Sequence, residues 1–93
     1  DKVSMGTIAA RDASRVITLT EQVIVALSCA AVQAVKLKGV DTELSPVLTA
    51  FQHWVLQSFT YVEEDRPLQQ ELQALVNRFE QLELLDSIAV QYL

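Results

Sequence analysis

The segment 3–38 is built around the uncharged run Gln22-Val23-Ile24-Val25-Ala26-Leu27-Ser28-Cys29-Ala30-Ala31-Val32-Gln33-Ala34-Val35. No glycine or proline occurs between Gly6 and Gly39, so the segment predicts one long helix that ends near Gly39. The centre of this helix is apolar on nearly every face, and such a helix must be covered on all sides. Because the rest of the chain offers only two or three shorter helices, we expect part of the cover to come from outside this chain.

The composition is that of one small helical domain. The chain has 93 residues, of which 51% are hydrophobic, and its 2 glycines and 2 prolines are too few for the tight turns of an all-β domain. The net charge of −5, without a cluster of Lys and Arg, argues against binding to nucleic acid or anionic membranes. The uncharged run has 14 residues, fewer than the about 20 that span a bilayer, and the first residues lack the basic-then-apolar start of a signal peptide. We therefore expect a cytoplasmic protein that binds neither nucleic acid nor membrane.

Two shorter amphipathic helices follow the long one. Ser45 and Pro46 are typical of a helix N-cap and first helical residue. Asp65 is expected to cap the next helix, with Pro67 in its first turn. The fold class is therefore all-α, a helical bundle fragment with one long apolar core helix. The expected helices span about residues 3–38, 46–59, 66–84 and, as a short C-terminal helix that the tail could form, 87–93.

Few residues are arranged for chemistry. The single cysteine, Cys29, lies within the uncharged run and is expected to be a buried thiol rather than a reactive one. His53 has no second histidine, cysteine or spaced carboxylate near it, which predicts a surface or hydrogen-bonded histidine rather than a metal ligand. Trp54 is expected to anchor a core or an interface. We predict no catalytic residue, cofactor-binding residue or metal site within this segment.

The start of the long helix allows two interpretations. Asp1 and Ser4 can each accept hydrogen bonds from free N–H groups of the first turn. Small residues are frequent over the next two turns, at 7–13. They favour either a close contact with another helix or a helix N-terminus aimed at an anionic group.

The same N-terminal residues carry a resemblance to a known family. The stretch Asp1-Lys2-Val3-Ser4-Met5-Gly6-Thr7-Ile8-Ala9-Ala10-Arg11 resembles part of the aromatic amino-acid ammonia-lyase and aminomutase family. Many members carry Asn-Gln-Asp or Gln-Glu-Asp, a variable residue, then Val-Ser-Met, often followed by Gly-Thr-Ile-Ala-Ala-Arg. These enzymes act on histidine, tyrosine or phenylalanine with an internally formed methylidene-imidazolone (MIO) electrophile. Residues 26–37, 44–46 and 64–68 are also similar to the family, so the resemblance covers most of the chain.

The resemblance implies that this chain is the C-terminal part of a large, mainly helical homotetramer whose long core helices come from all subunits. Its partners would be the remainder of the parent polypeptide and the other subunits, and the isolated segment would self-associate. Helix N-termini would point at the electrophile, which implies that Asp1 and Ser4 flank the active site. The Ala-Ser-Gly that forms MIO does not occur in this sequence. MIO would therefore lie in the rest of the parent enzyme, and the segment alone would be inactive.

Two functions from different classes follow. In the first, the chain is part of an ammonia-lyase or aminomutase that eliminates ammonia from an aromatic L-amino acid to give an arylacrylate. In the second, it is a stand-alone helical module for protein interaction or oligomerisation, without enzymatic activity. The sequence upstream of Asp1 distinguishes them, because the enzyme requires an Ala-Ser-Gly there.

Overall fold

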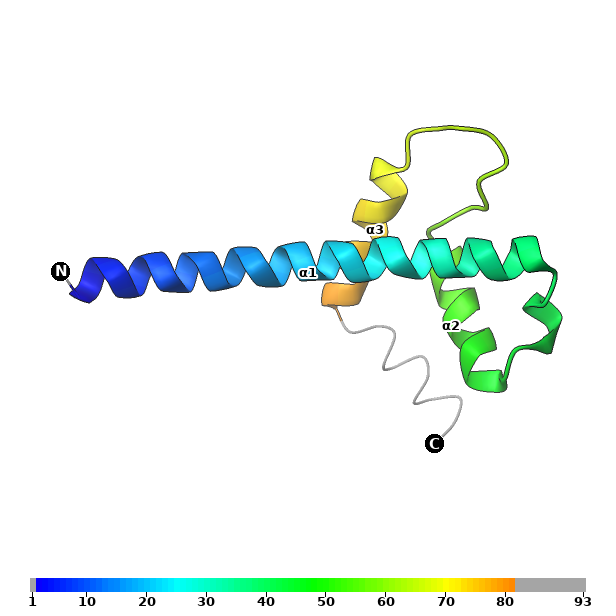
Figure 1. The fold of residues 1–93 in the computed structure, drawn as a ribbon, viewed down its shortest axis with the longest axis horizontal. Coiled ribbons are helices and arrows are strands. Elements are labelled where there is room, and N and C mark those ends of the chain that lie inside the picture. Colours follow the sequence, from blue (N-terminus) through cyan, green and yellow to red (C-terminus); the bar gives the residue numbers. More distant parts are fainter. Residues whose placement is uncertain (1, 82–93) are drawn as a thin grey trace.

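The computed structural model describes residues 2–81, which form three α-helices and one short 3-10 helix, with no strand in that range (Figure 1). The all-α fold class, with one long apolar helix and shorter helices after it, is confirmed. The short helix expected at 87–93 lies outside the described residues, and the third helix ends at Glu80 rather than near residue 84. In chain order the elements are α1 (Lys2–Lys38), η1 (Asp41–Glu43), α2 (Pro46–Leu56) and α3 (Gln69–Glu80).

Helix α1 runs without interruption for 37 residues and ends where the sequence predicts. Gly39 follows it with a positive φ of 76°, and its N–H donates to the carbonyl oxygens of Val35 and Lys36 at 3.1 Å each. Glycine takes this left-handed conformation without the cost that a Cβ would add. At the other end the helix begins at Lys2, so Ser4 lies inside the first turn and is not its N-cap, contrary to one of the two expectations for that residue.

Helix α2 begins as predicted and ends earlier. The Ser45 hydroxyl accepts a hydrogen bond from the Leu48 N–H at 3.3 Å, and Pro46 is the first helical residue. The helix ends at Leu56 rather than near residue 59. The chain turns immediately afterwards, and this turn brings Phe59 into the core, where it is 3% exposed.

The expected start of the third helix at residue 66, with Asp65 as its cap, is wrong. Helix α3 begins at Gln69, after a loop that the Arg66 guanidinium holds in place. Arg66 donates to the Thr60 carbonyl oxygen at 2.7 Å and to Glu71 Oε1 at 2.9 Å. Since Glu71 Oε1 also accepts the Thr60 N–H at 2.9 Å, this ion pair closes the loop over the first turn of α3.

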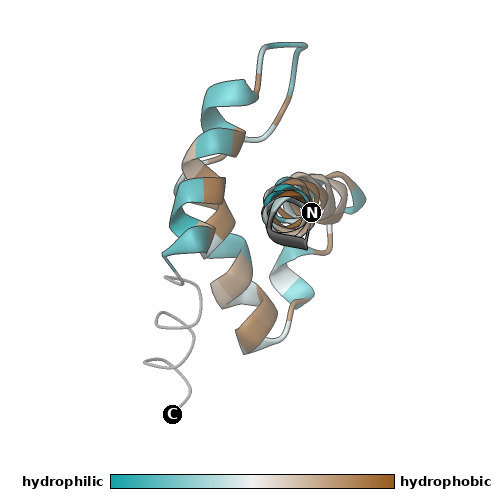
Figure 2. Cartoon of the chain, turned by 90° about the vertical axis from the view of Figure 1, so that its left-hand side faces the viewer, coloured by the Kyte–Doolittle hydropathy of each residue, from teal (hydrophilic) through white to brown (hydrophobic). Residues whose placement is uncertain are grey.

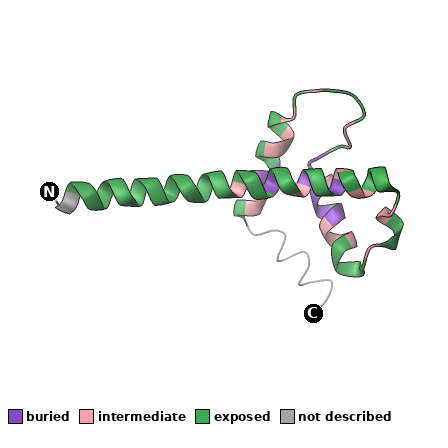
Figure 3. Cartoon of the chain, in the orientation of Figure 1, coloured by how far each residue is buried: buried purple, intermediate pink, exposed green. Residues whose placement is uncertain are grey.

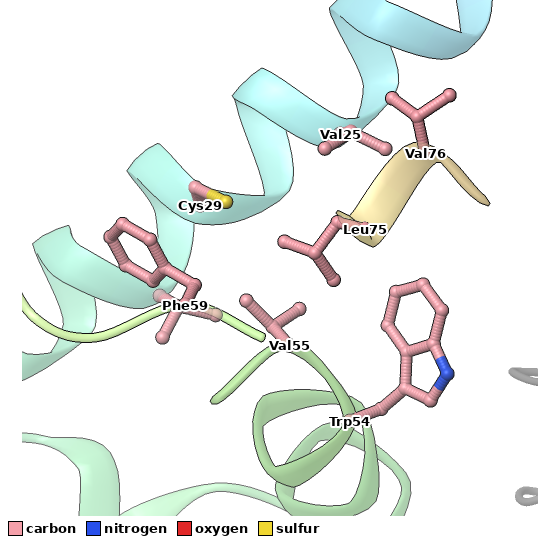
Figure 4. Packing of buried hydrophobic residues seen from close by; sticks show 8 residues of the cluster. Val25, Cys29, Trp54, Val55, Phe59, Leu75 and Val76 are labelled. Carbon is pink, nitrogen blue, oxygen red and sulfur yellow. The ribbon is translucent and has the colours of Figure 1, made fainter. Parts of the chain in front are cut away.

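Helices α2 and α3 pack on one side of α1 and cover only its C-terminal half (Figures 1 and 2). Val55 and Leu75 are the most deeply buried large side chains, at 0% and 1% exposure. The burial expected for Cys29 and Trp54 is confirmed, at 5% and 4% exposure. Figure 4 shows how these side chains meet. The core consists of Val25, Cys29, Val32, Trp54, Val55, Phe59, Leu75 and Val76.

Two polar side chains fasten the shorter elements to this core. The Gln33 side chain of α1 accepts a hydrogen bond from the Val62 N–H at 2.8 Å and donates one to the Val62 carbonyl oxygen at 3.2 Å. Arg78 of α3 donates to the Trp54 carbonyl oxygen at 2.9 Å and lies over the Trp54 ring, 4.7 Å from its centroid. These contacts join the loop to α1 and α3 to α2.

By length and composition alone, the part of α1 from Ser4 to Lys38 is long and apolar enough to cross a membrane. The core helix of a soluble protein passes the same criterion. The expectation that this helix does not span a membrane, drawn from its short uncharged run, therefore stays a prediction.

Candidate functional site

The residues expected beside an active site lie at the free end of α1. Ser4 is exposed in the first turn of this helix, and Asp1 lies outside the described residues. This end of α1 projects away from α2 and α3 (Figure 1). No other described element of the chain therefore supplies a side chain that could act together with Ser4.

The remaining candidates for chemistry are dispersed. His53 is exposed on α2, which agrees with a surface histidine. Within residues 2–81, no three His, Cys, Asp or Glu side chains gather in a way that could hold a metal ion.

Cys29 is buried between α1 and the rest of the core. Burial and, as the smaller cause, the negative charge of the nearby Glu71 carboxylate together raise the pKa of its thiol to about 11. The thiolate is the reactive form of cysteine, so this environment suppresses nucleophilic chemistry.

We expect Cys29 to react slowly with a thiol reagent at pH 8 in the folded protein and at the rate of a free thiol in concentrated urea. The reason is that both its burial and its raised pKa disappear on unfolding. The release of a coloured thiolate from a disulfide reagent measures both rates. Equal rates in buffer and urea would contradict the burial described above.

Two carboxyl groups, one near each end of α3, have shifted pKa values: Glu71 of α3 itself and Glu21 of α1. The hydrogen bond from Arg66 and then that from the Thr60 N–H lower the pKa of Glu71. At the other end of α3, a hydrogen bond with Glu80, followed by desolvation and charge repulsion, raises the pKa of Glu21 on α1. The stabilisation linked to Glu71 is therefore lost as the pH falls through its folded-state pKa, whereas that linked to Glu21 is lost as the pH rises through its own.

We expect Glu71→Gln to flatten the acid side of the stability profile. In the wild-type chain, the contribution of Glu71 is present above its unfolded pKa and is lost as the pH falls through its lowered folded-state pKa. The glutamine variant has no such carboxylate to protonate, so its urea midpoint should change less between pH 6 and pH 3. Glu64→Gln, at an exposed position of the preceding loop, is the matched control and should keep the wild-type profile.

The most extensive feature of the surface is an apolar row along α1. Its members recur at intervals of three or four residues, the spacing at which side chains share one face of a helix. All of them are exposed, and six are large apolar side chains that are 52–78% exposed. We call this row the α1 seam; it consists of Met5, Ala9, Asp12, Val16, Leu19, Val23, Leu27, Ala30, Ala34 and Leu37.

The α1 seam faces away from the core. Nine residues make two and a half helical turns, about 180° in direction. Val16 is nine residues before the buried Val25, and Val23 is nine residues before the buried Val32, so both seam residues lie on the side of α1 opposite those buried residues. The exposure of the whole N-terminal half is visible in Figure 3.

An open groove lies between α1 and α3, and the seam residues Leu19 and Val23 form part of its wall. Its volume is about 660 Å³, and its lining combines aliphatic side chains with three glutamine amides. No ionisable side chain lines the groove, so its lining is better suited to binding an apolar side chain of a partner than to catalysing a reaction. The lining residues are Leu19, Gln22, Val23, Ala26, Gln69, Leu72, Gln73 and Val76.

The sequence indicated an apolar helix but did not separate its two faces. The signal that identifies the α1 seam is the recurrence of its members at intervals of three or four residues, which is present in the sequence. The polar contacts of Gln33 and Arg78 join residues far apart in the chain, so no local sequence pattern predicts these contacts.

Comparisons with known proteins add no relative. No family model matches this chain, and neither a curated protein nor a solved structure matches it.

Proposed function

We propose that this chain is the C-terminal structural and oligomerisation part of an MIO-dependent aromatic amino-acid ammonia-lyase or aminomutase. The observation that carries the proposal is the similarity of Asp1–Arg11 to that family. In this assignment the parent enzyme is a cytoplasmic homotetramer that eliminates ammonia from histidine, tyrosine or phenylalanine to give an arylacrylate.

The exposure of α1 supports an assembly role. Most of the helix is exposed, and its N-terminal half contributes no buried side chain among its described residues. Contiguous exposed apolar surface of this length is typical of an interaction site. Other parts of the parent polypeptide and other subunits would cover it in the assembled enzyme.

The free end of α1 would then lie next to the active site. A helix N-terminus carries about half a positive elementary charge, which favours negative charge that develops in a transition state. Asp1 and Ser4 would flank that site. The electrophile itself would belong to upstream sequence, because no Ala-Ser-Gly occurs among these 93 residues.

An assay of the intact parent protein tests this proposal. The purified product of the whole reading frame should release an ultraviolet-absorbing arylacrylate from tyrosine, histidine or phenylalanine, and the 93-residue chain alone should release none. If the intact product acts on none of the three amino acids and also interconverts none of them with its β-amino isomer, the enzyme assignment is wrong.

A stand-alone interaction module is the second candidate. The observation that favours it is the exposed α1 seam. A reading frame close to 93 residues long would select this function over the first.

A further inference from the structure

The α1 seam is self-complementary. Its first and last members, Met5 and Leu37, lie at equal distances from Glu21, and so do Leu19 and Val23. A second copy of α1 that runs in the opposite direction, related by a two-fold axis near Glu21, would thus place three of the five seam pairs directly opposite each other. The other two pairs, Ala9 with Ala34 and Val16 with Leu27, would be offset by one residue.

We propose that two copies of this chain pair through the α1 seam as an antiparallel dimer. The inference deepens the assembly role proposed above and rests on it. It names the occupant of the exposed face, the direction of that occupant and its register. Met5 faces Leu37 of the second copy, Leu19 faces Val23, and Val16 faces Leu27.

The small residues of the α1 seam fit this register. Ala9 comes to lie opposite Ala34 of the second copy, so the two backbones can approach closely toward both ends of the interface. Large aliphatic side chains face one another in the central part. Apart from Asp12, large aliphatic side chains therefore face large ones and alanine faces alanine across the interface.

Charge selects the antiparallel direction. Asp12 is the only charged residue of the α1 seam. In a parallel, in-register pair it would face Asp12 of the second copy, and two like charges would be buried together. In the antiparallel pair it faces Ala30, whose small side chain leaves the carboxylate a path to water. The dipoles of the two helices also point in opposite directions in this arrangement, which is favourable for helices that lie side by side.

In the N-terminal half of α1, the face opposite the α1 seam is polar, as expected for a face that stays in contact with water. On the side of α1 that is buried farther along the helix, the residues nearer the N-terminus are polar and exposed. They are Thr7, Arg11, Ser14 and Thr18. This half of the helix is therefore amphipathic, polar where no described element covers it and apolar along the seam. A second copy on the seam would bury the apolar side and leave the polar side in water.

The interface is large enough for a stable dimer. From Met5 to Leu37 the α1 seam is about 48 Å long at a rise of about 1.5 Å per residue. Six large apolar side chains and three alanines from each copy would bury on the order of 700 Å² per copy, close to the about 800 Å² per partner in stable complexes. Helices α2 and α3 pack mainly on the other side of α1 (Figure 2), and α3 approaches the seam only at the groove beside Leu19 and Val23.

Site-directed cross-linking tests the direction and the register. Ala9→Cys and Ala34→Cys are prepared as separate variants of the 93-residue chain and treated with a short bis-maleimide, alone and as an equal mixture. We expect cross-linked dimer in the mixture only, because two copies of residue 9 would lie about 37 Å apart along the helix axis. The wild-type chain, whose Cys29 is buried, is the control and should not be cross-linked.

Cross-linking of either variant by itself would overturn the antiparallel pairing, and so would the absence of cross-linking in all samples. The result is separable from the enzyme assignment. A reading frame without Ala-Ser-Gly would refute the lyase assignment and leave the cross-linking pattern unchanged. If the parent protein is a lyase and the cross-linking pattern is not observed, only the antiparallel pairing through the α1 seam is refuted.

A charge placed in the α1 seam tests the interface independently. Val16→Arg should raise the dimer dissociation constant by at least about 100-fold, because each dimer would bury two unpaired guanidinium groups. Ser14→Arg, an exposed position on the opposite face of the same helix, is the matched control and should associate like the wild type. Sedimentation equilibrium measures both constants, and circular dichroism confirms that both variants stay helical. Equal constants for the two variants would contradict the proposal.

Discussion

Replacing Leu75 with alanine should lower the free energy of unfolding by about 3 kcal/mol, the largest effect expected for a single side chain here. Leu75 is 1% exposed and lies between α1 and α2, where it contacts the core residues drawn in Figure 4. Its truncation loses apolar burial and leaves a cavity that three elements would have to close together. Urea unfolding followed by circular dichroism measures the loss.

Leu48→Ala is the matched control for this experiment. Leu48 belongs to α2 and is 51% exposed, so the same chemical change should cost less than about 1 kcal/mol. The protein concentration must be held constant, because association contributes to apparent stability. Similar losses for the two variants would show that α3 does not pack on α1 and α2 as described.

Replacing Arg78 with alanine should cost about 2 to 3 kcal/mol, the second largest effect. The guanidinium donates to the Trp54 carbonyl oxygen at 2.9 Å, to Ser58 Oγ at 2.8 Å and to Gln57 Oε1 at 2.7 Å. It also lies over the Trp54 ring. Hydrogen bonds to a charged group contribute about 1.5 to 3 kcal/mol, and the cation–π contact adds about 0.5 to 1 kcal/mol at a partly exposed site.

Two comparison variants define what Arg78 contributes. Arg78→Lys should recover less than half of the loss, because a single ammonium group cannot replace a planar fork that bonds three acceptors and lies over an aromatic ring. Arg11→Ala makes the same chemical change at an exposed position of α1 and should be close to neutral. Urea midpoints measure all three variants. Full recovery by lysine would contradict a role for the fork geometry.

Local sequence signals predicted the beginnings and ends of elements where the controlling contacts are local. Gly39 ends α1 because glycine readily adopts a positive φ, and Ser45 caps α2 through a hydrogen bond to a residue three positions later. Cys29 and Trp54 are buried as their apolar surroundings predicted. These outcomes depend on residues that are close in sequence.

Long-range contacts explain the errors. The start of α3 was placed too early because Asp65 and Pro67 look like a helix start. The chain instead stays irregular to Leu68, and Arg66 bonds back to Thr60 and forward to Glu71 across the loop. The end of α2 was placed too late for a similar reason, since the burial of Phe59 depends on where α1 and α3 lie.

The candidate site was predictable to a smaller extent than the fold. The sequence predicted that the centre of α1 is apolar on nearly every face, but which face packs inward depends on the topology of α2 and α3 around Val25 and Val32. The assignment of Asp1 and Ser4 to the edge of an active site depends on resemblance alone. No contact within residues 2–81 can replace the parts of the enzyme that such a site requires.

The intact mass of the polypeptide encoded by the whole reading frame tests the central claim most directly. If this chain is the C-terminal part of an MIO-dependent lyase, that polypeptide will be several-fold larger than 93 residues. Its mass will be lower than the encoded mass by two water molecules, and the loss will map to an upstream Ala-Ser-Gly with ultraviolet absorbance. A product close to 93 residues, or a larger one with its full encoded mass, would contradict the claim.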